Sequence, residues 1–483
     1  MNTDRSRWLA LYVLCAGMLM IVLDATIVNV ALPSIKDDLN FSQNNLAWVV
    51  NAYLIAFGGL LLLAGRLGDL IGQRRVFLTG LAVFTAASLL CGIAQDQVML
   101  IAARFVQGVG GALTSAVILG MIVTMFSDPK ELAKAIGVYG FVASGGGSIG
   151  LLAGGVLTSL INWHWIFFVN LPVGIVTGYL AMRLVPNRDG VGFKQGADVR
   201  GAALLTGGLM LGVYTILQVE HHGWVSLFTL GLGAVAIALI AAFVVRQAHV
   251  ANPLMPLRLF RSRNVSGANV VQALMVAGMF GMFFLGALYL QQILGYDALG
   301  VGLAFLPAMV VMGAMSLRFA GPITARFGTK PTLVVSFVFV AAGLFLFAHT
   351  PVQGHFFSDV MPPMLLIGFG AGLGFPALTT QAMSGATPED SGLASGLVNT
   401  TVQVGGAIGL AVLSTLAAER TDGLKAHGHD VLTSLNSGYH LAYIVGGVLA
   451  VVAAGVAATV LHTKAADVPV AEPAQAAELA EAV

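Results

Sequence analysis

Fourteen runs of apolar residues divide the chain, and polar or basic segments separate each run from the next. An apolar α-helix needs about 20 residues to cross the hydrocarbon core of a bilayer, and each run is close to that length or longer. The runs are apolar on every face instead of on alternate residues, which argues against a barrel of transmembrane strands. The predicted spans are 8–32, 46–64, 76–94, 98–125, 135–161, 164–184, 201–219, 225–245, 265–293, 299–317, 331–348, 360–382, 392–418 and 439–461. The pattern therefore predicts an all-α integral membrane protein with fourteen transmembrane helices.

The composition agrees with a lipid environment. Hydrophobic residues make up 57% of the 483 positions and charged residues only 9%, whereas soluble proteins have about 25% charged residues. The net charge of +1 offers no electrostatic reason to expect a nucleic-acid partner. Cys15 and Cys91 lie inside apolar runs, and no cluster of histidines or carboxylates within a span suggests a metal site. We therefore expect no metal, no cofactor and no enzymatic activity.

Lysine and arginine are concentrated at alternate ends of the predicted spans. With the N-terminus in the cytoplasm, 19 of the 23 fall in cytoplasmic segments, three fall outside (Lys36, Arg420 and Lys425), and Arg104 lies within a span. Cytoplasmic loops of membrane proteins carry such an excess. We expect a multi-pass protein of the cytoplasmic membrane with both termini in the cytoplasm. The run 8–32 is too long for the apolar part of a cleaved signal peptide and is predicted to be the first span.

Two loops indicate an internal repeat. Residues 65–75 (GRLGDLIGQRR) and 317–330 (LRFAGPITARFGTK) are both short, basic, glycine-containing connections on the predicted cytoplasmic side. If they are equivalent, six-helix units begin at the first and ninth spans, and the seventh and eighth spans are an insert. The predicted organisation is a six-helix bundle over 1–190, two inserted helices with flanking loops over 191–260, a second six-helix bundle over 261–464 and a disordered cytoplasmic tail over 465–483.

Two charged residues lie deep within predicted spans. Asp24 lies in the first span and Arg104 in the fourth, about 13 and 9 Å below the outer ends of their helices. Charges at such depth are costly and usually functional. Burial favours the protonated carboxyl and a nearby guanidinium favours the anion, so Asp24 beside Arg104 can take up and release a proton. The alternative is a permanent ion pair that only locks two helices, which is an expensive way to obtain stability.

The loop after the second span carries a cluster of glycines and charges. Its candidate gating residues are Gly65, Gly68, Asp69, Gly72, Arg74 and Arg75. A tight turn between helices needs glycine where a side chain would clash or where φ is positive. The alternative to gating is a plain hairpin whose basic residues follow the positive-inside rule.

Glycines also recur within the fifth span. Residues 145–150 (GGGSIG) match the dinucleotide-binding pattern G-x-G-x-x-G, but that pattern has meaning only between a strand and a helix. The spacing instead allows a neighbouring helix to approach closely and allows this helix to bend. The glycines concerned are Gly146, Gly150, Gly154 and Gly155. Plain helix packing is the alternative for most of them.

Several amide side chains lie inside predicted spans. They are candidates for the lining of a substrate cavity, but each can equally be a hydrogen-bonding contact between helices. The candidates are Asn29, Asn51, Gln107, Asn269, Gln272, Gln291, Asn399 and Gln403.

Taken together, these motifs resemble the fourteen-helix drug:proton antiporters of the major facilitator superfamily, over about residues 8–461. The matching strings are LDATIVNVALP (23–33), GRLGDLIGQRR (65–75), Arg104 with Gln107, Gly108 and Gly110, WHWIFFVNLP (163–172), and GLASGLVNT (392–400) with Gln403. The resemblance implies the major facilitator fold, two six-helix bundles plus two inserted helices. It also implies proton coupling by Asp24 and Arg104, and a role for Asp69 in holding the cytoplasmic gate shut, facing the start of the thirteenth span.

Two positions depart from the family pattern. The antiporter motif of the fifth helix has proline where this chain has Leu151, so the built-in kink and the missing N–H are lost while the packing glycines remain. His164 stands where the family usually has arginine, which affects only a loop contact. The prediction of antiport therefore rests more on Asp24 and Arg104 than on the fifth helix.

The sequence thus predicts proton-coupled efflux of small hydrophobic or cationic compounds, drugs and antibiotics included, by alternating access of a monomer. Its partners are the substrate, protons and the lipid bilayer. A dedicated exporter of one metabolite or antibiotic would have the same sequence features. A channel, a sensor or a membrane enzyme is a more remote alternative, and an enzyme would need a reactive cluster that the spans do not contain.

Overall fold

A computed structural model describes residues 4–126, 129–187, 190, 192, 198–251, 253–255, 257–383 and 391–461 of the chain. Every secondary-structure element in these ranges is a helix. Thirteen of the described helices are long and apolar enough to cross a membrane, and α5 adds a shorter apolar stretch, Ile149–Leu160. The all-α membrane architecture predicted from the sequence is confirmed. The predicted tail over 465–483 lies outside the described residues.

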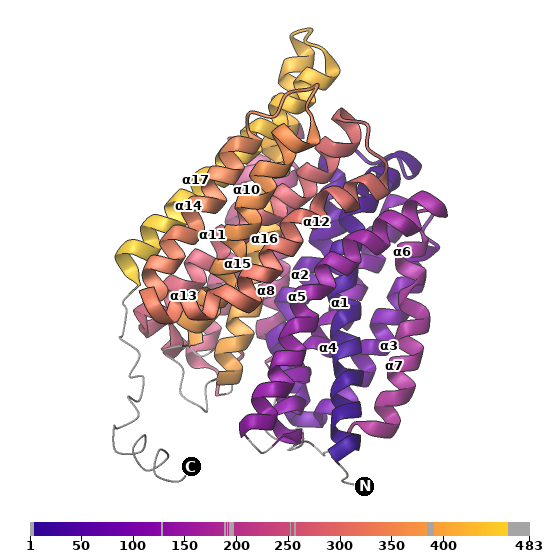
Figure 1. The fold of residues 1–483 in the computed structure, drawn as a ribbon, viewed down its shortest axis with the longest axis vertical. Coiled ribbons are helices and arrows are strands. Elements are labelled where there is room, and N and C mark those ends of the chain that lie inside the picture. Colours follow the sequence, from indigo (N-terminus) through magenta and orange to yellow (C-terminus); the bar gives the residue numbers. More distant parts are fainter. Residues whose placement is uncertain are drawn as a thin grey trace, which may run out of the picture.

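The helices form two bundles that lie side by side (Figure 1). The first contains α1 (Asp4–Asp38), α2 (Gln43–Ile71), α3 (Gln73–Gly92), α4 (Gln97–Met125), α5 (Pro129–Leu160), α6 (Trp165–Phe168) and α7 (Asn170–Leu184). Then follow α8 (Val199–Leu217), α9 (Val219–His222) and α10 (Leu227–His249). The second bundle contains η2 (Leu257–Arg261), α11 (Arg263–Leu288), η3 (Tyr289–Ile293), α12 (Ala298–Ala314), η4 (Met315–Phe319), α13 (Ala320–Phe327), α14 (Thr329–Phe347), η5 (Phe356–Val360), α15 (Met361–Met383), α16 (Ser391–Ala426) and α17 (Val431–Val460).

The two basic connections that indicated the repeat, 65–75 and 317–330, are mostly helical. Helix α2 continues to Ile71, so Gly65, Gly68 and Asp69 lie in its last two turns and only Gly72 separates it from α3. The segment 317–330 is likewise taken up by η4 and α13. No proline interrupts residues 65–71, and the helix therefore propagates until a residue reverses the chain. The prediction of a longer loop after the second span was wrong in its extent.

The two bundles share the same reversal. Gly72 is both the C-cap of α2 and the N-cap of α3, with φ 98° and ψ 130°. Gly328 joins α13 to α14 in the same way, with φ 86° and ψ 160°. Only glycine adopts this region without strain. The repeat indicated by the two basic segments thus has a structural counterpart in these two glycines.

The two bundles pack against each other along α2 and α16, and further contacts lie at the end of the helices opposite the N-terminus. We call that end the distal side; the N-terminus lies on the proximal side. Gln291 in η3 donates a hydrogen bond to the Val30 carbonyl of α1 at 2.8 Å. The Leu299 N–H of α12 donates to the Ser159 hydroxyl of α5 at 3.0 Å. A Cβ added at Gly302 of α12 would lie 2.6 Å from the Leu151 carbonyl oxygen. The distal ends of α1 and α5 are therefore closely packed against the second bundle.

Candidate functional site

Asp24 and Arg104 meet in the interior of the first bundle. The guanidinium Nη1 of Arg104 donates to the Asp24 carboxylate at 2.5 Å. Asp24 is 0% exposed and Arg104 is 1% exposed. The two helices that carry them, α1 and α4, pack against each other, so the structure places the charges in direct contact.

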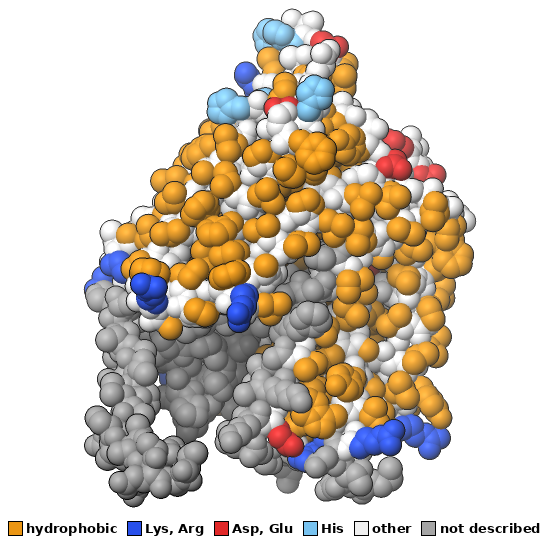
Figure 2. Space-filling model, viewed as in Figure 1, with side chains coloured by type: hydrophobic (Ala, Val, Ile, Leu, Met, Phe, Trp, Pro, Cys, Tyr) orange, Lys and Arg blue, Asp and Glu red, His pale blue; other side chains and the backbone are white. Residues whose placement is uncertain are grey.

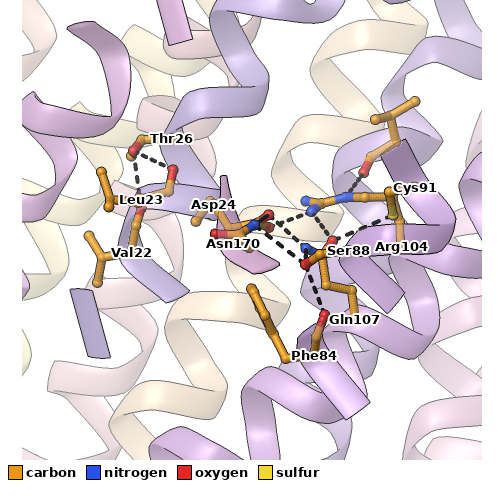
Figure 3. A network of polar contacts seen from close by, with 12 residues as sticks. Val22, Leu23, Asp24, Thr26, Phe84, Ser88, Cys91, Arg104, Gln107 and Asn170 are labelled. Carbon is orange, nitrogen blue, oxygen red and sulfur yellow. Dashed lines mark hydrogen bonds and ion pairs between the residues drawn. The ribbon is translucent and has the colours of Figure 1, made fainter. Parts of the chain in front are cut away.

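Two amides complete the surroundings of the carboxylate (Figure 3). Gln107 of α4 donates to Asp24 Oδ1 at 2.7 Å, and its own carbonyl oxygen accepts from Arg104 at 2.6 Å. Asn170, the first residue of α7, donates to the same Oδ1 at 3.1 Å. Ser88 of α3 accepts hydrogen bonds from both amides, at 2.8 and 3.4 Å. Four helices of one bundle, α1, α3, α4 and α7, thus converge on one carboxylate.

Asn170 and Ser88 were not among the residues predicted from the sequence as site residues. Asn170 belongs to the string WHWIFFVNLP, which carried the family resemblance but no assigned role. The short helix α6 ends at Phe168, and the break before Asn170 places that residue at the start of α7, facing Asp24. Ser88 is a small polar residue in an apolar helix and also donates to the Phe84 carbonyl at 2.8 Å, so the sequence around it contained no signal of this contact.

Arg104 also joins the cluster to α2. Its Nε donates to the Val49 carbonyl at 2.9 Å. The guanidinium carbon lies 4.4 Å from the centroid of the Tyr53 ring and 5.8 Å from that of Phe167. A guanidinium at such distances is attracted to the ring faces, most strongly where water is excluded. The cation is therefore held by a carboxylate, two carbonyl oxygens and two aromatic rings.

The cluster is arranged for an ionised carboxylate. Asp24 accepts three hydrogen bonds, and a charged pair in a low-dielectric site is stable only when both partners are so satisfied. Adding a proton to Asp24 removes an acceptor and leaves the charge of Arg104 uncompensated, which forces the donors to rearrange. The carboxylate has no exposed surface in this conformation. A proton from bulk water therefore has no direct access to it in this conformation.

The candidate gating residues lie at the proximal end of α2. Asp69 lies 3.9 Å from Arg66, and its side chain is 57% exposed. Arg74 donates a hydrogen bond to the Met182 carbonyl at the end of α7. The side chains at the start of α16, which the resemblance places opposite Asp69, lie outside the described residues. A gating role for this segment stays a prediction.

Two glycines of this segment provide a stability test. Gly72 has φ 98°, and an alanine there is expected to destabilise the protein by about 1–3 kcal/mol. Gly65 is helical, and among the described residues no atom outside its own helix lies within 4 Å of an added Cβ, so Gly65→Ala is expected to stabilise by about 0.5–1 kcal/mol. Thermal unfolding of the purified variants in detergent measures both. Equal melting temperatures for the two would contradict the assigned backbone geometry.

The glycines of α5 contact two different helices. Gly146, Gly150 and Gly154 lie against Leu19, Thr26 and Ile27 of α1. Gly155 instead faces α12, where an added Cβ would lie 2.8 Å from the Ala298 carbonyl oxygen. Helix α5 runs unbroken through Leu151, which is 1% exposed. The close-packing role predicted for these glycines matches these contacts, and one of them packs at the junction between the bundles.

The amide candidates do not gather at one place. Gln107 belongs to the Asp24 cluster, and Gln291 joins the bundles at Val30. Asn29 donates back to its own helix, at Ala25. Neither amide atom of the buried Asn51 has a hydrogen-bond partner among the described residues. The remaining candidates are Asn269, which accepts from Thr401, Gln272, which is buried, Asn399, which is exposed, and Gln403, which packs against Gly58.

Comparison with known proteins places this architecture in a family. The sequence model of the Major Facilitator Superfamily matches residues 14–410, most of the chain. The chain belongs to the major facilitator superfamily. Solved structures share the fold, with a TM-score of 0.67 for a bacterial homologue of the human lysosomal transporter Spinster at 16% identity, covering 94% of this chain and 97% of that one.

Several curated relatives with higher identity are named for antibiotic resistance or export. The puromycin resistance protein pur8 of Streptomyces alboniger is 37% identical over 457 residues, which cover 92% of this chain and 90% of that protein. The cephamycin export protein CmcT of Amycolatopsis lactamdurans is 38% identical over 426 residues, or 86% of each chain. The lincomycin resistance protein of Streptomyces lincolnensis is 34% identical over 415 residues, or 85% of this chain and 84% of that protein.

Proposed function

We propose that this major facilitator protein exports small hydrophobic or cationic compounds, antibiotics among them, across the cytoplasmic membrane in exchange for protons. The observation that supports proton exchange is the fully buried Asp24, ion-paired with Arg104 and bonded to two amides. The resistance and export functions of the relatives support efflux as the direction.

The charge distribution supports an orientation with the proximal side in the cytoplasm. Figure 2 shows an apolar band, with Lys and Arg mainly at its proximal edge and histidines and acidic residues mainly at its distal end. Basic residues favour the cytoplasmic side of a membrane. In this orientation the distal contacts close the transporter to the outside, as expected of an inward-facing state.

Helix α1 offers a route from the proton site to the junction of the bundles. Asp24 lies six residues before Val30, about 9 Å along the helix. Val30 accepts the hydrogen bond from Gln291 of the second bundle. Protonation of Asp24 releases α1 from α4 and α7, which weakens the distal junction and biases the protein towards the outward-facing state.

Transport into inverted membrane vesicles tests this function. Vesicles that contain the protein are expected to accumulate a fluorescent organic cation when acidified inside, and a protonophore is expected to stop the accumulation. Uptake that is insensitive to the protonophore would contradict proton coupling but would still be consistent with export. Vesicles without the protein give the background.

A dedicated exporter of a single antibiotic is the second candidate. The relatives named for puromycin, cephamycin and lincomycin favour it, because each name refers to one compound. Minimal inhibitory concentrations for a panel of unrelated compounds, with and without expression, distinguish the two. Protection against one structural class alone indicates the dedicated exporter.

A further inference from the structure

A second buried carboxylate lies at the cytoplasmic end of the inserted helices. Asp198 caps the N-terminus of α8 and accepts from the Gly201 N–H at 2.9 Å. It also accepts from Arg246 at 2.6 Å and from Gln247 at 2.8 Å, both on α10. Burial raises the pKa of Asp198, but these hydrogen bonds outweigh burial and hold the pKa below its ordinary value. The ionised Asp198 therefore fastens α10 to α8 at neutral pH.

Gln247 extends this contact to the connection between the insert and the second bundle. Its side-chain carbonyl accepts the backbone N–H of Met255 at 3.1 Å. Gln247 is itself buried, and a Cβ at Gly201 would lie 2.7 Å from its amide nitrogen. Asp198 fixes the orientation of this amide, and the amide fixes the backbone at Met255.

The side chain of Met255 lies between the two bundles. On one side it packs against a cluster of Leu62 from α2, Ala202 from α8 and Leu254. On the other side it packs against Val265 of α11 and Leu397 of α16. Methionine is flexible and apolar, which suits a side chain that fills the space between surfaces that move.

Met255 contacts both α2 and α16 and lies between them like a wedge. The two helices approach closely where a Cβ at Gly58 would lie 2.7 Å from the Cβ of Gln403. Leu62 follows Gly58 by four residues and Leu397 precedes Gln403 by six, so both lie on the cytoplasmic side of this approach. Met255 therefore fills the angle between α2 and α16 on the side that must close in the outward-facing state.

We propose that Asp198 is a positioning residue for the transport cycle: through Gln247 it holds Met255 as a wedge between α2 and α16, and the wedge favours the inward-facing state. This inference rests on the proposed alternating access. The insert is anchored at its other end as well, where Trp224 donates to Glu419 of α16 at 3.1 Å. Its proximal connection is thus the part placed to control closure.

Distances across the cytoplasmic opening test the proposal without any substrate. Spin labels on Met182→Cys of α7 and Ala325→Cys of α13, both exposed, report the separation of the bundles by double electron–electron resonance. The native Cys15 and Cys91 are buried. Met255→Ala removes the apolar contacts of the wedge, and Asp198→Asn weakens the hydrogen bonds that hold it in place. Each variant is therefore expected to lower the ratio of the long-distance population to the short-distance population by about threefold or more.

A double variant separates positioning from general support of the fold. If Asp198 acts through Met255, Asp198→Asn adds nothing in the Met255→Ala background. Equal effects of Asp198→Asn in both backgrounds, or an unchanged distribution in Met255→Ala, would overturn the proposal. Thr229→Val is the matched control, since Thr229 is buried and bonded to Ser226 at the other end of the insert. Failure of drug export would leave these distances unaffected, so the two proposals fail separately.

Discussion

Asp24→Asn is expected to abolish protonophore-sensitive export and to destabilise the protein. Asparagine cannot carry the proton, and it leaves the charge of Arg104 buried beside Tyr53 and Val49 without a counter-ion. Removing one partner of a buried ion pair costs about 3–5 kcal/mol. Vesicle transport measures the loss of coupling, and thermal unfolding of the purified protein measures the loss of stability.

The double variant Asp24→Asn with Arg104→Gln distinguishes a proton site from a structural lock. It removes both charges and keeps amides able to bond to Gln107 and Asn170, so stability is expected to recover substantially. If the pair serves proton coupling, protonophore-sensitive export stays absent in the folded double variant. Recovery of export together with stability would show that the pair only holds α1 against α4.

Gly302→Leu is expected to open the distal side and reduce export by about tenfold. A Cβ at Gly302 would lie 2.6 Å from the Leu151 carbonyl oxygen, so a leucine cannot fit while α5 and α12 are in contact. Overpacking costs about 1–3 kcal/mol, and 1.4 kcal/mol changes an equilibrium tenfold. Spin labels at the exposed Leu160 of α5 and Phe357 of η5 are expected to show a longer distance than in the parent protein.

Gly313→Leu is the matched control for this variant. Gly313 lies on the same helix, α12, but in the part of the chain that the structure describes no atom of another element lies within 4 Å of an added Cβ. Export and the distal distance are expected to stay at the parent level. Equal losses in both variants would indicate a general sensitivity of α12 to leucine instead of a specific junction with Leu151.

The sequence indicated the Asp24 pair because the signal is local. A carboxylate and a guanidinium in apolar helices are recognisable without any knowledge of packing, since each is costly in lipid on its own. Their partners are ordinary polar residues. Ser88 and Asn170 become part of the site only because α3 and α7 pack around α1, at separations of 64 and 146 residues from Asp24.

The spans of the helices were predictable from the sequence, but the residues at which the helices end were not. The apolar runs located the spans, yet α16 continues to Ala426 and α17 begins at Val431, beyond the predicted 418 and before the predicted 439. Hydropathy measures transfer into lipid, whereas a helix ends only where its backbone hydrogen bonds stop or a residue reverses the chain. The turn at Gly72 is one residue long for that reason.

By itself the sequence determined the lipid environment, the spans and the charged pair within them, because these depend on the transfer energy of individual segments and side chains. The tertiary structure decided which residues surround Asp24, that Leu151 packs against Gly302, and that Met255 lies between the bundles. These contacts join helices far apart in the chain. Their energies depend on shape and distance between surfaces, which no local pattern of residues encodes.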